Sequence, residues 1–185
     1  MLQHTDPYDP RSHIRGVRVR RLKVNKDPRG ILVETLRADW PDFYDERELP
    51  FAQSYYSVTE AGVARDEDRW HLHRAQEDRF VVLSGVLAVA MHDPRPDSPT
   101  RGLVNVFRMG DLQDEEGRYA LMVPRRVHHG FVVGPADPAM LMNFPTQIYS
   151  PADEGRIPLS EVGARLPDGS PFSWDAVRVL LELTK

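Results

Sequence analysis

Four histidines and one glutamate are the residues of this chain best suited to chemistry. His71 and His73 are two positions apart, and Glu77 follows four residues after His73. Side chains at positions i and i+2 of a β-strand point to the same face, so both imidazoles should enter one space. His128 and His129 come about fifty residues later. Two strands that carry histidines and lie far apart in sequence predict one shared pocket.

The pattern of His71, His73 and Glu77 before a glycine, followed by Pro124 to His129, resembles the cupin motifs, and this resemblance implies one of two kinds of chemistry. An imidazole has an unperturbed pKa near neutrality, so it can act as a general base that removes a proton from carbon. Alternatively, two histidines at strand spacing, a glutamate and a later histidine can bind one divalent metal ion. In this chain that metal set is His71, His73, Glu77 and His129. The residues alone leave both interpretations open.

The bulk properties indicate an ordinary globular chain. Its 185 residues fit one domain, and we predict a flexible tail over 1–13 and a single domain over 14–185. The formal net charge of -4 gives no electrostatic sign of a nucleic-acid partner, and the absence of cysteine excludes disulfides and thiolate chemistry. No apolar run approaches the roughly 20 residues of a membrane span, and the N-terminus does not read as a signal peptide. We therefore expect a cytoplasmic protein without a membrane partner.

The apolar pattern predicts many short strands. Sixteen prolines and twelve glycines divide the chain into short segments, several of which alternate apolar with polar residues. The predicted strands are 17–24, 31–36, 51–59, two within 79–92, 103–107, 119–123, 130–133, 140–143 and 147–149. We also predict one short helix within 40–49, a loop over 150–170, and a C-terminal helix with Ser173 as its N-cap. This pattern favours an all-β antiparallel barrel or jelly roll.

Several short motifs, taken in order, make the chain resemble the dTDP-4-dehydrorhamnose 3,5-epimerase family of the cupin superfamily. They are Asp27-Pro28-Arg29-Gly30 with Glu34, Phe51-Ala52-Gln53 with Ser57, Gly62-Val63, Pro124 with His129-Gly130-Phe131-Val132-Val133, and Tyr149-Ser150-Pro151 with Glu154. The resemblance extends over residues 17–175. It implies a cupin jelly-roll β-barrel with a short C-terminal helix, a homodimer that exchanges N-terminal strands, and no required cofactor.

The resemblance also implies a reaction. The family abstracts a proton next to the ketone of a nucleotide-linked, dTDP-type 4-keto-6-deoxy sugar. By position, His73 matches the general base, Asp175 the aspartate that orients it, and His129 the histidine near the substrate. Such a base works better when a carboxylate holds its far nitrogen, and the developing enolate needs a hydrogen-bond donor or a cation.

Further positions match residues that bind the substrate. Arg29, Glu34 and Gln53 correspond to positions that contact the nucleotide. The arginine ahead of the base corresponds to Arg69 or Arg65, and Arg69 is nearer in sequence. The resemblance therefore predicts a nucleotide-sugar substrate that lies against side chains from several separate segments.

Two departures from the family pattern keep the activity open. Asn143 stands where the family has an acid tyrosine, and an amide cannot protonate a carbanion; the family's lysine is replaced by Asp78 or Arg79. The additional His71 resembles a His-Ala-His-Lys stretch of sugar-nucleotide 3,4-ketoisomerases, which move a proton along one face of the sugar. An epimerase, a ketoisomerase, a metal-dependent cupin and a catalytically silent binding cupin therefore remain as hypotheses.

Overall fold

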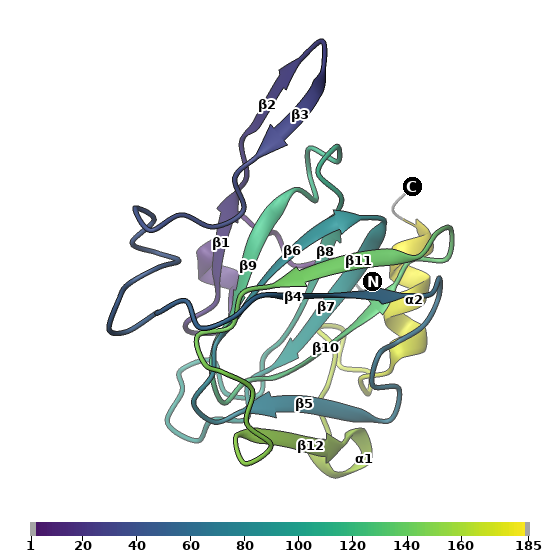
Figure 1. The fold of residues 1–185 in the computed structure, drawn as a ribbon. Helices are drawn as coiled ribbons and strands as arrows, with labels where there is room; N and C mark the ends of the chain where they lie inside the picture. The colour runs from purple at the N-terminus through teal and green to yellow at the C-terminus, as the bar shows by residue number, and fades with distance from the viewer. Residues whose placement is uncertain (1–2, 184–185) are drawn as a thin grey trace.

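Two antiparallel β-sheets face each other and form the body of the protein (Figure 1). The structure is a computed structural model that describes residues 3–183. The first sheet has the order β1 (Arg18–Arg21), β9 (Tyr119–Val123), β6 (Asp78–Ser84), β11 (Ala139–Asn143), β4 (Tyr55–Thr59). The second has the order β12 (Glu154–Pro158), β5 (Arg69–His73), β10 (His128–Val133), β7 (Val86–His92), β8 (Val104–Gly110). The predicted all-β jelly-roll architecture is confirmed.

Alternating side chains build separate apolar layers on the two faces of the second sheet. On β7, Leu87 and Val89 point into the core between the sheets, where they meet Phe80 of β6. Ala88 and Ala90 point to the opposite face and pack beneath the C-terminal helix. Small side chains on that face allow a helix to lie close to the strands. The strand is therefore buried on both faces, which explains its long apolar run.

The helix that covers this outer face is α2 (Trp174–Leu183). Its N-terminus is capped as predicted, because the Ser173 hydroxyl oxygen accepts a hydrogen bond from the Ala176 N–H at 3.2 Å. A Cβ added to Gly130 would lie 2.9 Å from the Trp174 ring, so β10 carries a glycine where the helix approaches most closely. No helix within residues 3–183 is long and apolar enough to cross a membrane.

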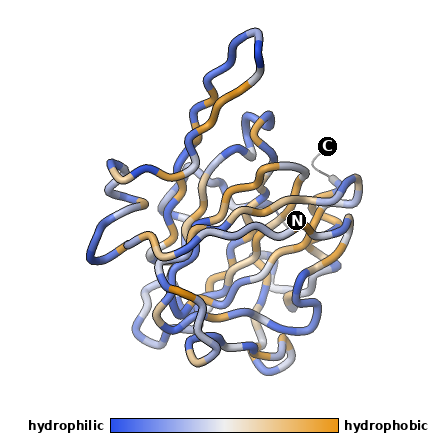
Figure 2. The backbone as a smooth tube through the Cα atoms, viewed as in Figure 1, coloured by the Kyte–Doolittle hydropathy of each residue, from blue (hydrophilic) through white to orange (hydrophobic). Residues whose placement is uncertain are grey.

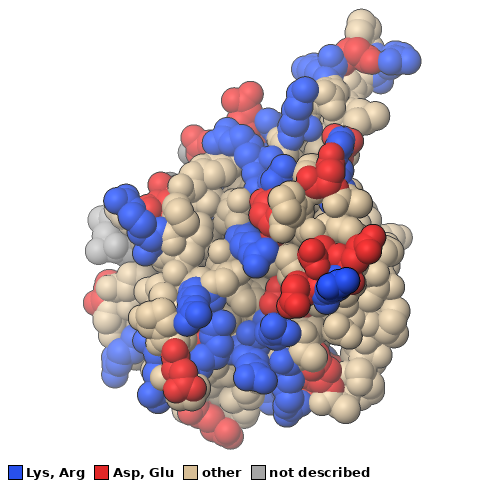
Figure 3. Space-filling view, turned by 90° about the vertical axis from the view of Figure 1, so that its left-hand side faces the viewer, with Lys and Arg blue, Asp and Glu red and all other residues tan. Residues whose placement is uncertain are grey.

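A β-hairpin projects from the body (Figures 1 and 3). It consists of β2 (Val24–Asp27) and β3 (Gly30–Val33), which form a two-stranded sheet of their own. The strand predicted over 17–24 is interrupted at Leu22, whose side chain turns inward and is buried. Leu32 is 62 % exposed, so the hairpin carries apolar side chains far from the core (Figure 2).

Three further segments differ from the sequence prediction. The predicted loop over 150–170 contains β12 and a one-turn helix, α1 (Leu159–Val162). β12 pairs with β5, a distant segment, so its local sequence gave little sign of a strand. Neither a strand over 147–149 nor a helix within 40–49 appears among the described residues. Phe43 of the latter segment is instead buried, and its carbonyl accepts a hydrogen bond from Arg79.

The described part of the N-terminal segment lies against β8. The Thr5 N–H donates to the Val106 carbonyl at 2.7 Å, and a short 3-10 helix, η1 (Pro10–Ser12), follows. The ring of buried His13 packs edge-on against Phe107. Residues 3–13 thus have defined contacts with the body, while the mobility predicted for a 1–13 tail and the domain boundary at residue 14 stay predictions.

Candidate active site

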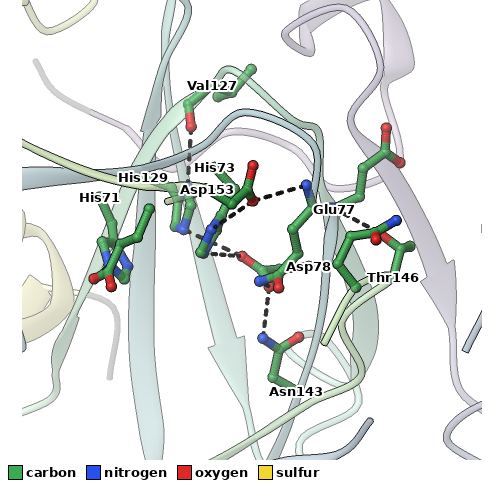
Figure 4. A network of polar contacts seen from close by, with 12 residues as sticks. His71, His73, Glu77, Asp78, Val127, His129, Asn143, Thr146 and Asp153 are labelled. Atoms are coloured by element: carbon green, nitrogen blue, oxygen red, sulfur yellow. Dashed lines mark hydrogen bonds and ion pairs between the residues drawn. The ribbon is translucent and has the colours of Figure 1, made fainter. Parts of the chain in front are cut away.

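Three histidines converge on one wall of a cavity between the sheets (Figure 4). His71 and His73 lie on β5 with two-residue spacing, and His129 lies on the neighbouring strand β10 in register with His71. Their ring centroids are 5.3 to 5.8 Å apart. Trp70, between the two strand histidines, points to the opposite face and is fully buried beside Trp174 of α2. Strand alternation therefore puts the histidines of β5 on the cavity face and its tryptophan on the packed outer face.

The opposite wall of the cavity comes from the first sheet. Its polar side chains are Asp78 of β6, Asn143 of β11 and Tyr55 of β4. The cavity has a volume of about 480 Å³. A ligand in this cavity would have imidazoles on one side and a carboxylate, an amide and a phenol on the other.

Asp78 is the carboxylate that faces the histidines, a place that the sequence prediction gave to Glu77. Its Oδ2 atom lies 3.4 Å from Nε2 of His129 and 3.7 Å from Nε2 of His73, and the residue is 2 % exposed. Its Oδ1 atom accepts hydrogen bonds from the side-chain amides of Gln76 and Asn143, both at 2.8 Å. Asp78 is thus held rigidly at the floor of the cavity.

Glu77 points away from this cavity, which corrects its place in the alternative metal set with the histidines. Adjacent residues at the start of a strand have opposite orientations, so Glu77 and Asp78 cannot both face inward. The Glu77 carboxylate lies 3.8 Å from Arg125, and its N–H donates to the Thr146 hydroxyl at 2.9 Å. Burial raises the pKa of Glu77 despite the nearby arginine. Glu77 belongs to the contacts between loops and not to the histidine wall.

The carboxylate behind His73 is Asp153, whereas the sequence prediction assigned Asp175. Nδ1 of His73 has no hydrogen bond among the described residues, and Oδ2 of Asp153 lies 3.4 Å from it. The N–H groups of Arg74, Ala75 and Gln76 all donate to the Asp153 carboxylate, which fixes its position. At 3.4 Å the Asp153 carboxylate faces the His73 ring without a hydrogen bond to it.

Asp175 is not brought to His73. It lies in the first turn of α2, on the outer side of the second sheet. Its side chain is 89 % exposed and pairs with Arg178 at 2.7 Å. The prediction was wrong about the position because α2 covers the face that carries Trp70 and not the face that carries His73.

Glu154 orients the second histidine of β5. Its Oε1 atom lies 2.5 Å from Nε2 of His71, and Tyr149 donates to its Oε2 atom at 3.1 Å. The hydrogen bond with His71 is the main cause that lowers the pKa of Glu154 to about 2, and Arg156 contributes. Glu154 therefore stays ionised at neutral pH and holds His71 in one orientation.

His129 has a defined tautomer. Its Nδ1 atom lies 3.1 Å from the Val127 carbonyl, which only accepts, so Nδ1 carries the hydrogen. Burial lowers the pKa of His129, because the charged ring would lose its hydration. The neutral ring therefore presents the lone pair of Nε2 to the cavity.

The remaining predicted substrate residues fall into two groups. Gln53 and Asn143 line the cavity, and so does Arg65, the alternative to Arg69. Arg69 pairs instead with Asp68 on the surface. Arg29 and Glu34 are also absent from the lining of this cavity.

Arg29 and Glu34 belong to the projecting hairpin and the segment that follows it. Arg29 is 89 % exposed and pairs with Asp27, its neighbour in the turn. Glu34 pairs with Arg37. Within one chain, therefore, the predicted nucleotide contacts are split between the cavity and the hairpin.

Three residues of the site were missed as functional candidates: Tyr55 and Glu154 line the cavity, and Asp153 lies behind His73. Tyr55 was read only as part of a strand, Asp153 was placed in a loop, and Glu154 was noted only within a motif. For Tyr55 a usable signal was its place two residues after Gln53 in the strand predicted over 51–59, because alternation in that strand would put both on one face. Asp153 and Glu154 had no local signal, since their positions depend on the pairing of β12 with β5.

The histidine wall also has the composition of a metal site. Nitrogen atoms of His71, His73 and His129 lie within 4.8 Å of one another, and Asp78 places a carboxylate oxygen close to two of them. Imidazoles and a carboxylate suit a divalent transition metal. If an ion binds here, these four residues would hold it, and Glu77 would not.

The chain is similar to proteins of one family over most of its length. A family model described as dTDP-4-dehydrorhamnose 3,5-epimerase matches residues 11–166. A probable low-salt glycan biosynthesis epimerase of Haloferax volcanii is 41 % identical over 149 residues, which cover 79 % of this chain and 88 % of that protein.

Solved structures agree. A dTDP sugar isomerase from Desulfovibrio desulfuricans has the same fold, with a TM-score of 0.72 at 23 % identity over 88 % of this chain and 92 % of its own. A 4-keto-6-deoxy sugar epimerase from the novobiocin biosynthetic gene cluster of Streptomyces spheroides has a TM-score of 0.66 at 26 % identity, with coverages of 99 % and 88 %. The chain therefore belongs to the dTDP-4-dehydrorhamnose 3,5-epimerase family.

Proposed function

We propose that the protein is an isomerase that removes a proton next to the ketone of a nucleotide-linked 4-keto-6-deoxy sugar. The observation that carries this proposal is the position of His73, which has its Nε2 atom at the cavity and Asp153 behind its Nδ1 atom. Membership of the family and the name of the Streptomyces relative give the substrate class. No metal ion is required in this reaction scheme.

His73 is the proposed general base. A base that abstracts a proton from carbon needs its lone pair on the substrate side and a partner for the hydrogen on its other nitrogen. In the structure, Nε2 lies 3.7 Å from Asp78 at the floor of the cavity, and Nδ1 faces Asp153. Asp153 would hold the ring and stabilise the imidazolium that forms.

The developing enolate needs a donor, and Arg65 is the strongest candidate. A role for His129 at the enolate oxygen would require a hydrogen on Nε2, and only the protonated ring would have one. Arg65 lines the same cavity as a permanent cation, as does Arg156. We assign the enolate to Arg65, and we retain His129 as a residue of the wall that faces the ketone.

The hairpin supports a homodimer. Arg29 and Glu34 lie outside the cavity of their own chain, and the exposed Leu32 lies on the same hairpin. We propose that two copies exchange their N-terminal strands, which would cover Leu32 and carry Arg29 towards the partner cavity. Small-angle scattering at micromolar concentration tests this proposal, and a monomer profile would contradict it. The cytoplasmic location also stays a prediction.

Solvent deuterium incorporation tests the reaction. The protein is incubated in D2O with a dTDP-linked 4-keto-6-deoxy sugar, and mass spectrometry follows the mass of the sugar. We expect at least one deuterium next to the ketone. A protein that exchanges none with any nucleotide keto sugar would contradict the proposal and leave a binding role.

Ketoisomerisation is the second candidate, and one observation favours it. His71 and His73 lie on the same wall, as needed to move a proton along one face of the sugar. The product separates the two reactions, because a ketoisomerase yields a 3-keto sugar and an epimerase yields an inverted centre at an unchanged ketone position.

A further inference from the structure

The wall opposite the histidines carries a phenol whose hydrogen is not used within the described residues. Tyr55 of β4 is the direct cross-strand partner of Asn143 on β11, and both side chains line the cavity. The Tyr55 hydroxyl oxygen has one hydrogen-bond partner among the described residues, the Asn143 amide nitrogen at 2.9 Å. Tyr55 therefore lies beside the position at which the sequence lacks an acid.

The direction of this hydrogen bond follows from the other contacts of Asn143. Its Oδ1 atom accepts the N–H of Arg79 at 3.0 Å, which fixes the orientation of the amide. Its Nδ2 atom then donates one hydrogen to Asp78 at 2.8 Å and the other to Tyr55. Because Tyr55 is the acceptor, its own hydroxyl hydrogen is available to a ligand in the cavity.

The surroundings of Tyr55 act on the pKa of its hydroxyl in two opposite directions. Tyr55 is 48 % exposed; the burial of the rest of the side chain raises its pKa, and the negative charge of Asp78 raises it further, so the phenol is neutral near pH 7. The hydrogen bond from Asn143 acts in the opposite sense, because an N–H donor stabilises a phenolate. A group of this kind can release one proton and then recover it from solvent.

The other tyrosine in the cavity lacks this property. Tyr149 also lines it, but its hydroxyl donates to Glu154 at 3.1 Å, and its side chain is largely exposed. Tyr56, the neighbour of Tyr55 on β4, does not line the cavity and is 61 % exposed. Tyr55 alone among these three combines a free hydrogen with a position facing the histidine wall.

We propose that Tyr55 is the general acid of the reaction and that the protein inverts the carbon next to the ketone. The inference rests on the proposed function. His73 on the second sheet takes the proton from one face of the sugar, and the electrons of the C–H bond form the enolate. Tyr55 on the first sheet gives its hydroxyl proton to the same carbon from the opposite face, and the C–H bond forms again with inverted configuration. The phenolate then takes a proton from solvent, and His73 releases one to solvent.

Tyr55→Phe tests the proposal, with Tyr56→Phe as the matched control on the same strand. Each protein is incubated with a dTDP-linked 4-keto-6-deoxy sugar in D2O. Mass spectrometry measures exchange, and reduction of the ketone followed by NMR gives the configuration of the carbon. Circular dichroism melting confirms that each variant is folded.

We expect Tyr55→Phe to keep exchange within about ten-fold of the parent, because His73 can return a solvent-derived deuteron to the same face. Formation of the inverted product should fall by about a hundred-fold or more, the usual contribution of a general acid. Tyr56→Phe should match the parent in both measurements.

Three outcomes would count against the proposal, and they are distinguishable. Inversion by Tyr55→Phe at the parent rate would overturn the role of Tyr55 alone. Exchange without inversion in the parent would show that no acid acts from the opposite face. A parent that shows no exchange would overturn the proposed function, and this inference with it.

Discussion

Two groups of histidines lie on opposite faces of the same sheet, and they differ in the side chains that surround them. His128 and His129 are consecutive on β10, yet His129 faces the cavity and His128 faces outward. There Nδ1 of His128 lies 3.2 Å from Nδ1 of His92, and its ring stacks on Trp70. The inner group, His71, His73 and His129, lies near three carboxylates. The outer pair, His92 and His128, lies mainly against aromatic rings.

Strand alternation therefore determines the face of the sheet on which a histidine lies, and the elements that pack against that face determine which groups surround its ring. Burial and the neighbouring His92 lower the pKa of His128 to about 4, so this ring is neutral near pH 7. Burial also lowers the pKa of His92, although Asp93 opposes the shift. A neutral, buried and stacked pair serves packing. His73 instead has Asp153 behind it and an open cavity in front.

The largest expected effect comes from the inner group. His73→Ala should lower deuterium exchange by about a hundred- to ten-thousand-fold, since it removes the proposed base. His92→Gln, in the outer pair, should leave exchange within about three-fold if the protein folds normally. The measurement is the initial rate of deuterium incorporation by mass spectrometry. If His73→Ala exchanges as fast as the parent, His71 becomes the candidate base.

The next largest effect distinguishes Asp153, which lies behind His73 in the structure, from Asp175, which the sequence resemblance matched to the orienting aspartate. Asp153→Asn should lower exchange by about ten-fold or more, because a neutral amide stabilises the imidazolium less well than a carboxylate. Asp175→Asn should change it by less than about two-fold, since that side chain is 89 % exposed on α2. The same exchange assay compares both variants. A large loss in Asp175→Asn alone would restore the sequence assignment.

The outer pair should make the free energy of unfolding depend on pH. The folded-state pKa of His128 is lowered from 6.5 to about 4, so the unfolded chain binds more protons between these values. This contribution to stability is therefore complete above about pH 6.5 and is lost as the pH falls towards 4. The loss is about 3 kcal/mol at most for this residue.

Chemical denaturation at pH 7 and pH 4.5 measures this effect. The parent should lose more free energy of unfolding between the two pH values than His128→Phe, which has no proton to bind. Comparing the change with pH, and not the absolute stability, removes any packing defect of the variant. Equal losses in the two proteins would show that His128 does not set the acid sensitivity.

The smallest expected effect is that of chelation. We expect exchange to stay within about two-fold after dialysis against a chelator, because the proposed base needs its lone pair free. Elemental analysis by mass spectrometry would accompany the assay. A stoichiometric ion that survives dialysis, and whose removal abolishes exchange, would assign His71, His73, His129 and Asp78 to a metal centre.

The sequence by itself determined much of this protein. Period-two alternation placed His71 and His73 on one face, and Ser173 marked the start of α2. Short segments broken by proline and glycine indicated an all-β fold, and ordered motifs indicated the family, which the family model matches over residues 11–166. These features are local or ordered along the chain, so they can be read without knowing which strands pair.

Only the tertiary structure decided which partners the histidines have. Asp153 reaches His73 because β12 pairs with β5, and Tyr55 meets Asn143 because β4 pairs with β11. The choice of Asp78 over Glu77 depends on the register in which β6 enters its sheet. Pairing of strands distant in sequence depends on packing across the whole core, and no local pattern encodes it. The sequence therefore indicated His73 as the candidate base, while the fold shows which carboxylate and which phenol lie around it.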